Sequence, residues 1–559
     1  METHLLNLDY VAIGIYVLLM AAIGLSFGWF IKDIGSYFKG GSAIPWMMSA
    51  ISNFMALFST FVFVAYAGIA YEHGLVSITI FWSTVPACII GGVFLGRRWR
   101  RTGHTTPMEY LEQRYNLSVR QTITWFGLIM RFLDNMVRLY AIGVFITVVT
   151  PLSLVWSIII SGIIVTIFNI IGGVWSVVVM GTVQFFILIL AVLILFPLSL
   201  DHIGGFEALY QKLPEHMTWF NGPKGNMFWL VVFYLMIIIK YNENWTFIQK
   251  FYCVKDEKAA MKVGVATGIM FLVFTPLFLL PAVTSPLIVP NISDPEMSYV
   301  VMSKMLLPAG IMGILFSSMF AATMSSLNAE YNIMSGVLTN DVYKRLFKPE
   351  ANEKQLMIVA RLTTALVGAL VILGAIYVNV FGGAFEANKL FTGILAIPLG
   401  FPLILGILFK KPNSAAAIIT ILVGALSGII LNAMPSVSWE WATLIETIIC
   451  AMTYFIPGYL IKENESHIRQ VNQFFVQMST PILEEDKPVI SFEYKRMLTY
   501  LFVFSLLIAG GLFSGMSLPS IHLYSGQLSM GAGLLCMAGA LALWVYFKKV
   551  IEKTKYNER

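Results

Sequence analysis

The stretch GILFSSMFAATMSSLNAEYNIMSGVLTNDVY occupies residues 313–343 and places hydroxyl and amide side chains on an otherwise apolar helix. Ser325 and Ser326 are adjacent, and Ala321 and Ala322 precede them by one turn. A hydroxyl inside a membrane costs free energy unless it has a partner. Two interpretations follow. Small residues let membrane helices pack closely, and adjacent oxygens are ligands for a small hard cation.

The composition indicates an integral membrane protein. Of the 559 residues, 58% are hydrophobic and only 12% are charged, whereas a soluble domain carries roughly 25% charged residues. Apolar runs long enough to span a bilayer recur from end to end. The first run, 10–31, is too long for a cleavable signal and lacks a basic lead-in. The four cysteines show neither metal nor disulfide spacing.

The distribution of basic residues predicts the orientation of the chain. The loops with Arg97–Arg101, with Lys410 and Lys411, and the tail from Lys548 fall on one side, which is cytoplasmic by the positive-inside rule. The N-terminus is then outside and the C-terminus inside. About fifteen spans are expected, near 9–31, 45–72, 75–96, 121–150, 153–171, 177–200, 226–249, 260–286, 300–336, 357–379, 389–409, 414–434, 439–461, 497–516 and 528–547.

This count implies an internal repeat. Spans two to six and seven to eleven form blocks of five that run in opposite senses, which is the inverted repeat of many secondary transporters. Gly172-Gly173 and Gly382-Gly383 are expected to be tight turns. The predicted organisation is an N-terminal accessory helix and cytoplasmic loop (1–44), a first inverted repeat (45–200), an outer loop and second repeat (201–411), accessory helices (412–461), a cytoplasmic linker (462–496), and terminal accessory helices with a basic tail (497–559).

Several short motifs occur in order along the chain. They are Tyr37-Phe38-Lys39-Gly40-Gly41, Pro107 to Tyr115, Gly172-Gly173-Val174-Trp175-Ser176, Asn244 to Lys250, Ala321 to Asn332 with Asp341-Val342-Tyr343, and Leu405 to Lys411. With these motifs the chain resembles the sodium/solute symporter family, which includes sodium/glucose cotransporters and bacterial sialic acid symporters. The resemblance covers roughly residues 9–460.

The resemblance implies an all-α LeuT-type fold of ten core helices, with Na+ as the coupling ion. It also implies a sodium site that combines carbonyls of a broken helix with oxygens of a second helix. Such oxygens suit a hard cation in a cavity. The sodium ligands carried over by this resemblance are the carbonyls of Met55, Phe58 and Ala322 and the hydroxyls of Ser325 and Ser326.

The chain departs from the family pattern after its first glycine pair. The family usually has Thr-Asp there, followed three residues later by Gln. Here Met180 and Gly181 occupy the Thr and Asp places, and Gln184 is kept. A carboxylate that would favour a cation is missing. Coupling to one sodium ion is the simplest interpretation, and weak coupling or coupling to a proton stays open.

Charged residues inside the predicted spans are the second set of candidates. Arg131, Asp134 and Arg138 lie on one helix face. Asp134 could neutralise either arginine, leaving one positive charge, or an arginine could bind a solute carboxylate. Lys240 and Glu243 are expected to pair with each other.

The candidate solute ligands include polar and aromatic residues at the predicted helix breaks. For Asn244 the alternative role is to satisfy unwound backbone, and for the aromatic residues it is packing. The candidate solute ligands are Ser59, Thr60, Phe61, Arg131, Arg138, Asn244, Trp245 and Lys389.

Together these features predict a sodium-coupled symporter that imports a small polar solute by alternating access. The favoured solute is a sugar or a sialic-acid-like sugar acid, and the protein is expected to be a multi-pass protein of the cell inner (plasma) membrane. Its partners would be the solute and the lipid bilayer, without nucleic acid. The sequence offers no nucleophile with a spaced base, so no enzyme is predicted. The alternatives are an uncoupled or proton-coupled facilitator of an organic anion, and a transporter-like solute sensor.

Overall fold

The structure of the chain is helical. The computed structural model describes residues 5–28, 40–220, 226–461, 463–483, 485, 487 and 492–557, without the side chains of 21, 24–28, 40, 171–177, 492–499 and 549–557. The motif residues Tyr37, Phe38 and Lys39 lie outside the described residues. So do Lys462, Glu484 and Asp486 of the predicted linker. Over the described ranges there is no β-strand.

The longer helices follow the predicted spans. They are α1 (Asn7–Gly28), α3 (Trp46–Leu57), α9 (Leu117–Val149), α10 (Leu154–Ile203), α12 (Met227–Asn242), α14 (Glu257–Ile288), α16 (Ile311–Val337), α17 (Glu353–Ala375), α20 (Ser414–Ala433), α21 (Trp439–Leu460), α22 (Glu465–Ser479), α23 (Phe492–Ser517) and α24 (Tyr524–Asn557).

Shorter helices and turns connect them or extend them. They are α4 (Ala67–His73), α5 (Val76–Phe81), α6 (Thr84–Ile90), α7 (Arg97–Thr102), α8 (Glu109–Arg114), α11 (Gly205–Lys212), α13 (Trp245–Tyr252), α15 (Ser298–Leu306), α18 (Ala384–Phe391), α19 (Ile397–Gly400), η2 (Val62–Tyr66), η3 (Gly91–Gly96), η5 (Pro295–Met297), η6 (Leu338–Phe347), η8 (Thr392–Ala396) and η9 (Phe401–Leu405).

Many of these helices can cross a membrane. Within the described residues, 11 helices are long and apolar enough, and a bent pair, Trp46–Leu57 with Val62–His73, makes up to 12. Three shorter apolar helices accompany them. The prediction of an all-α membrane protein is therefore confirmed, while the count of about fifteen spans stays a prediction.

The backbone of α10 is helical through Gly172-Gly173, yet residues on either side of the glycines meet the same turn of α16. Asn169 Nδ2 donates to the Asn328 carbonyl at 2.5 Å, and a Cβ built on Gly181 would lie 3.2 Å from Ser325 Oγ. A straight helix would separate residues 169 and 181 by about 18 Å. The chain therefore reverses direction between them, which agrees with the predicted turn and leaves the predicted spans 153–171 and 177–200 as the two arms of α10. The predicted turn at Gly382-Gly383 is confirmed, since both residues have positive φ, 85° and 94°.

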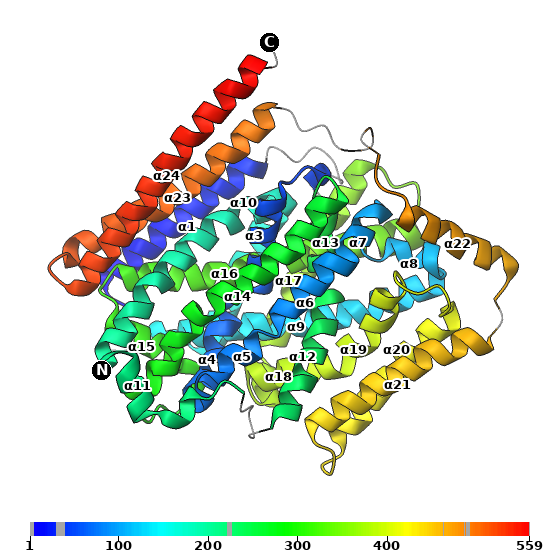
Figure 1. The fold of residues 1–559 in the computed structure, drawn as a ribbon, viewed down its shortest axis with the longest axis horizontal. Helices are drawn as coiled ribbons and strands as arrows, with labels where there is room; N and C mark the ends of the chain where they lie inside the picture. The colour runs from blue at the N-terminus through cyan, green and yellow to red at the C-terminus, as the bar shows by residue number, and fades with distance from the viewer. Residues whose placement is uncertain are drawn as a thin grey trace.

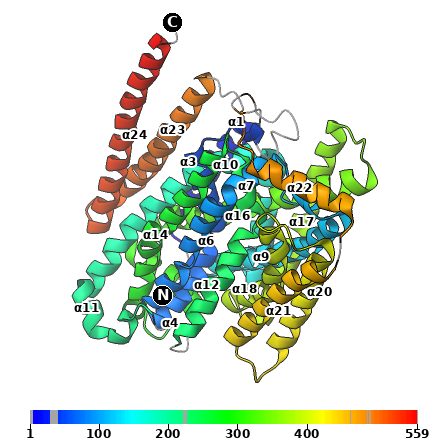
Figure 2. The same cartoon turned by 45° about the vertical axis from the view of Figure 1, so that its right-hand side comes forward.

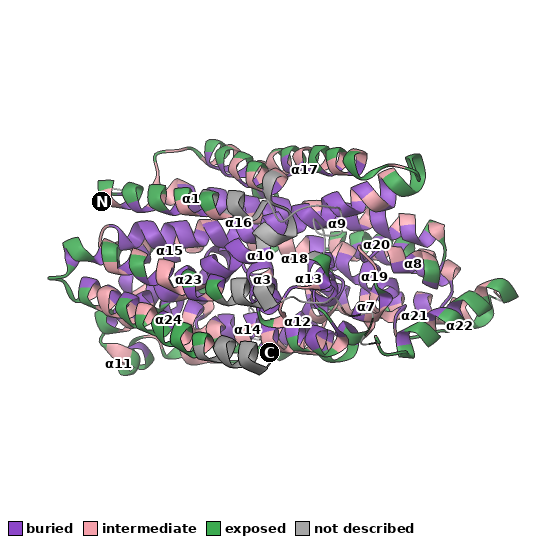
Figure 3. Cartoon of the chain, turned by 90° about the horizontal axis from the view of Figure 1, so that it is seen from above, coloured by how far each residue is buried: buried purple, intermediate pink, exposed green. Residues whose placement is uncertain are grey.

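The helices form a buried core with helix pairs at its edges. In Figure 1, α23 and α24 pair at one edge beside α1, and α20 and α21 pair at another; Figure 2 shows the same arrangement from a second side. In the most apolar stretch of α16, 94% of residues are buried, against 17% in α24. Figure 3 shows this contrast between the centre and the outer helices. The serine-bearing helix is therefore the centre of the bundle.

The accessory helix α1 is attached to the start of α16. Asp9 Oδ1 accepts hydrogen bonds from the backbone N–H groups of Gly310 at 2.7 Å and Gly313 at 2.8 Å. A carboxylate is favourable at a helix N-terminus, where free N–H groups and the helix dipole point toward it. This contact fixes the position of α1 on the core.

Two helices of the core are broken, and polar side chains stabilise each break. Between α3 and η2 the chain bends by 59°, and Phe58 is extended, with φ −101° and ψ 134°. Between α12 and α13, Asn244 is extended, and its Oδ1 accepts from the N–H of Phe247 at 2.9 Å. Non-helical backbone at membrane depth needs such partners or a cavity. The two breaks therefore mark the interior site.

Candidate functional site

The first break is tied to α16 by hydroxyl groups. Thr323 Oγ1 accepts from the N–H of Thr60 at 2.9 Å, and Thr60 Oγ1 donates to the carbonyl of Met319 at 2.6 Å. The N–H of Val62 donates to the Ser59 carbonyl at 3.0 Å instead of the Phe58 carbonyl four residues back, its usual helical acceptor. The carbonyl of Phe58 thereby loses that helical donor. The predicted sodium site has its Phe58 ligand at this break.

Ser325 is one of several buried polar residues of α16 with an unpartnered atom, and it is the one that lies beside Gly181. The residue is 3% exposed, and its Oγ has no hydrogen-bond partner among the described residues. The Ser326 hydroxyl donates to the carbonyl of Thr323 at 2.9 Å, which leaves its oxygen lone pairs able to accept. A buried hydroxyl without a partner is costly. A bound cation would use the oxygen of Ser325, so the residues present fit sodium.

Three helices meet at the position of the missing acid. A Cβ built on Gly181 of α10 would lie 3.2 Å from Ser325 Oγ of α16 and 3.8 Å from Met55 Cβ of α3. The departure from the family pattern therefore falls beside the predicted sodium ligands. In this chain that place holds no carboxylate, and the predicted sodium site would rely on hydroxyls and carbonyls.

A cavity of about 50 Å³ lies where the two breaks face each other. It is lined by Leu57, Ser59, Phe61, Val62, Tyr66, Phe81, Asp134, Arg138, Ile237, Lys240, Tyr241, Asn244 and Asn388. Ligand pockets usually have volumes of about 300–1,000 Å³. Solute entry would therefore require the surrounding helices to open.

The carboxylate of Asp134 binds both positively charged side chains that line this cavity, Arg138 and Lys240. Its Oδ2 accepts from Arg138 Nη2 at 2.8 Å, and its Oδ1 accepts from Lys240 Nζ at 3.0 Å and from Asn388 Nδ2 at 2.9 Å. Lys240 Nζ also donates to Thr392 Oγ1 at 3.0 Å. Helices α9, α12 and α18 are thus linked through one carboxylate.

The expected pair of Lys240 with Glu243 is wrong. Glu243 accepts from Arg131 instead, and both side chains are almost fully buried. Lys240 and Glu243 are one turn apart and both face α9, where they meet Asp134 and Arg131, which are also one turn apart, so each pairs across the two helices. The charge predicted to be left over on Arg131 is therefore neutralised by Glu243.

Glu330 of α16 completes this network. Its Oε1 lies 4.0 Å from Arg138 Nη1 and accepts from Asn244 Nδ2 at 3.2 Å. Asn244 caps the broken backbone, which is one of the roles considered from the sequence, and it also lines the cavity, while its contact with a solute stays a prediction.

The family of the chain follows from comparison with known proteins. The model of the sodium:solute symporter family matches residues 37–424. This chain belongs to that family. The symporter is 25% identical over 479 residues to the sodium/glucose cotransporter of Vibrio parahaemolyticus, covering 78% of this chain and 87% of the relative. It is 22% identical over 498 residues to the sodium/sialic acid symporter NanT of Aliivibrio fischeri, covering 82% and 94%.

A solved structure shows the same fold. The symporter superposes on a Na+-coupled sialic acid symporter in a substrate-bound outward-open state with a TM-score of 0.73 and 19% identity, covering 81% of this chain and 98% of the other. The predicted family, LeuT-type fold and sodium coupling are confirmed. The family consists of transporters rather than enzymes, and it implies a small-molecule solute and a multi-pass membrane protein.

The predicted solute ligands form two groups, those that line the central cavity and those that contact other parts of the protein. Ser59, Phe61, Arg138 and Asn244 line the cavity. The others point to protein partners: Thr60 binds α16, Arg131 binds Glu243, the indole of Trp245 packs on Gly127, and Lys389 binds Glu386 at 2.7 Å. Direct contact of this second group with a solute stays a prediction without support from the geometry.

Sequence reasoning did not select Asp134, Lys240 or Asn388 as cavity residues. On α18 the sequence indicated Lys389, whereas the residue that lines the cavity is its neighbour Asn388. Asp134 and Lys240 were recognised as intramembrane charges, which is itself a functional signal. Their convergence required the positions of α9 and α12 in space.

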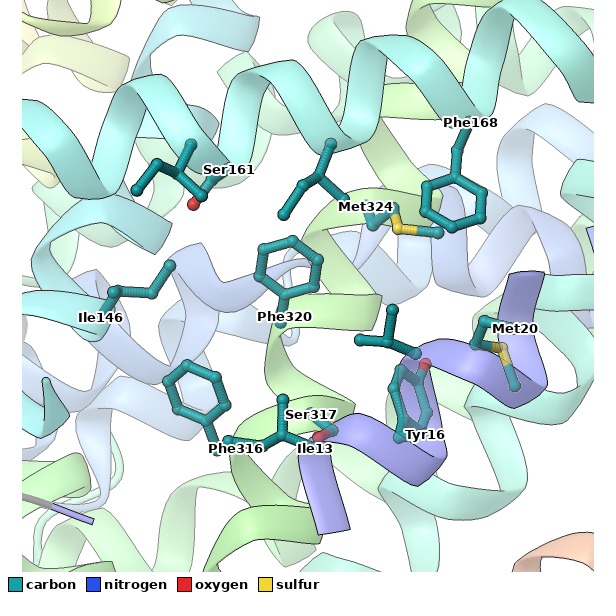
Figure 4. Close-up of a pocket in the computed structure, with 13 residues that line it drawn as sticks. Ile13, Tyr16, Met20, Ile146, Ser161, Phe168, Phe316, Ser317, Phe320 and Met324 are labelled. Carbon is teal, nitrogen blue, oxygen red and sulfur yellow. The ribbon is translucent and has the colours of Figure 1, made fainter. Parts of the chain in front are cut away.

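A second cavity of the symporter is apolar. It has a volume of about 160 Å³ and lies between α1, α9, α10 and α16. Figure 4 shows Phe316, Phe320 and Met324 of α16 facing Tyr16 and Met20 of α1 across it. It lacks the charged groups of the central cavity, so it does not suit a polar solute.

Proposed function

We propose that the chain imports a small polar solute, a sugar or sugar acid, together with Na+ by alternating access. The observation that supports this most is the meeting of both helix breaks at one polar cavity, together with the unpartnered hydroxyl of Ser325 near Met55 of the first broken helix. The sodium/glucose and sodium/sialic acid transport named for its relatives agrees with this solute class.

The proposed sodium ligands are the carbonyls of Met55, Phe58 and Ala322 with the hydroxyls of Ser325 and Ser326. Sodium would supply a positive charge that holds the first break against α16. Ser59 and Phe61 of the same break line the solute cavity. Ordering the break for one ligand therefore prepares it for the other, and the two affinities become linked.

The proposed topology has an external N-terminus, a cytoplasmic C-terminus and about fifteen spans in the cell inner membrane. The inverted repeats would be 45–200 and 201–411. The remaining proposed parts are the N-terminal accessory helix and cytoplasmic loop (1–44), the accessory helices (412–461), the cytoplasmic linker (462–496) and the terminal accessory helices with the basic tail (497–559). Alternating access would move one repeat bundle against the other around the fixed site. No enzymatic activity is part of this proposal.

A facilitator is the second candidate, and Gly181 favours it. Without a carboxylate beside Ser325, a cation is held by neutral oxygens alone, and weaker sodium binding would weaken coupling. Uptake with and without a sodium gradient distinguishes a symporter from an uncoupled or proton-coupled facilitator.

The sodium site is tested by Ser325→Ala combined with Ser326→Ala. Because the variant loses both hydroxyl ligands, sodium-dependent uptake in proteoliposomes should fall to the background level. Ser318→Ala is the matched control, since its buried hydroxyl donates only to its own helix, at 2.7 Å from the Leu315 carbonyl. Sodium-dependent uptake that survives in the double variant would refute the site.

A further inference from the structure

The charged groups around the central cavity are balanced. Three cations, Arg131, Arg138 and Lys240, meet three acids within 4.0 Å: Glu243, Asp134 and Glu330. The sequence alone showed the excess of basic residues on α9 but not the acids that approach from α12 and α16. The network as a whole carries no net charge when all six groups are ionised.

Asp134 is the residue that keeps the cavity cations engaged. Arg138 and Lys240 both line the cavity, and both bind this one carboxylate. Lys240 cannot form a new pair with an anionic solute without giving up Asp134, and Arg138 keeps only its Nη1 for one while its Nη2 stays on Asp134. The side chain of Asp134 is 2% exposed, so water would not replace a lost partner.

A solute carboxylate would therefore enter a site that is already neutral. It would lie near Asp134 and Glu330 in a region of low dielectric, where like charges repel strongly and desolvation of an anion is costly. Uncharged hydroxyl groups meet no such cost. Arg138 Nη1 is buried without a hydrogen-bond partner in the described part of the chain, and Ser59, Asn244 and Asn388 provide further polar atoms.

We propose that Asp134 is a specificity-determining residue, which makes the cavity select an uncharged, hydroxyl-rich solute over its carboxylated counterpart. This inference rests on the proposed transport function. Of the two solute classes considered, sugar and sugar acid, it favours the uncharged sugar. It also predicts that specificity changes in either direction when the balance of charge is altered.

Asp134→Asn tests this proposal because it removes one negative charge and keeps the size of the side chain. The probes are matched pairs of sugars and uronic acids, such as glucose with glucuronate and galactose with galacturonate. Thermal stabilisation of the purified protein and competition for uptake are measured in sodium chloride. Wild type should respond to the neutral member, and the variant should shift the acid-to-neutral preference by about tenfold or more toward the acid.

Two further variants keep the test decisive. Lys240→Gln leaves the cavity with excess negative charge, so it should shift preference toward glucosamine, and it serves if Asp134→Asn does not fold. Glu446→Gln is the control, because this buried acid of α21 belongs to none of the ion pairs of the network and does not line the cavity. Its preference between neutral and acidic sugars should equal that of wild type.

The results separate this inference from the proposed function. Wild type that prefers the acids, an unchanged preference in Asp134→Asn and Lys240→Gln, or no response to any of these hydroxylated probes would overturn the inference. Loss of any sodium effect in wild type would instead contradict the symport function, whatever the charge preference.

Discussion

Gly181 lies opposite the unpartnered hydroxyl of Ser325, and only Ser325 Oγ and Met55 Cβ lie within 4 Å of a Cβ built there. Gly181→Asp would place a carboxylate beside the proposed sodium ligands. Because opposite charges attract strongly in a low dielectric, we expect the sodium concentration for half-maximal uptake to fall roughly tenfold. Sodium titration of uptake measures this change. Gly181→Asn has a similar size without the charge, and equal sodium affinity in both variants would contradict the electrostatic explanation.

At the scale of single residues, the sequence predicted which residue types form the site better than it predicted their partners. Ser325 and Met55 were placed at one site, and the structure brings both to Gly181. Lys240 was given the wrong partner, because spacing along α12 says nothing about which residues α9 presents. A salt bridge between helices depends on their relative rotation, which local sequence does not encode.

At the scale of elements, the side chain of Glu296 in η5 accepts hydrogen bonds from the backbone at the start of α18. Glu296 lies outside the membrane-spanning helices. The pKa of Glu296 is raised to about 7, first by burial and then by the charges of Asp294 and Glu72, while hydrogen bonds from the backbone N–H groups of Phe385 and Ala384 lower it. The folded-state pKa exceeds the unfolded value, so the folded state binds the proton more tightly. Glu296 therefore favours folding at low pH, and this contribution is lost as pH rises from about 4.5 to 7.

Glu296→Gln should remove this pH dependence. Relative to wild type, we expect the variant to gain roughly 2–4 °C in Tm between pH 5 and pH 8, because no buried charge forms at residue 296. Thermal unfolding of the purified protein at both pH values measures the difference. Glu350→Gln, at an exposed loop position, should leave the wild-type pH profile unchanged. A constant Tm difference between Glu296→Gln and wild type across this range would refute the assignment.

Membrane-spanning elements were predictable because twenty apolar residues have one stable arrangement in hydrocarbon. The break between α3 and η2 is different, since residues on both sides are apolar. Its position depends on the hydrogen bond from the N–H of Thr60 to Thr323, which is 263 residues away in the sequence. The glycine pair in α10 lies where the chain reverses between Asn169 and Gly181, and glycine eases such a reversal because it has no Cβ.

At the scale of the whole molecule, the central cavity and the proposed sodium site share the α3 break, so the proposed binding of the two ligands must be thermodynamically reciprocal. If sodium increases solute affinity by some factor, the solute must increase sodium affinity by the same factor, typically 5- to 150-fold. Both factors can be measured on the purified protein, from thermal shifts produced by a neutral sugar in sodium or choline chloride and by sodium with or without the sugar. We expect the two factors to agree in wild type and both to fall to about one in the Ser325→Ala, Ser326→Ala variant, since that variant keeps the solute cavity and loses the ion. Equal sugar shifts in sodium and choline would show that the solute does not require the ion, and the facilitator that Gly181 favours would then replace the symporter.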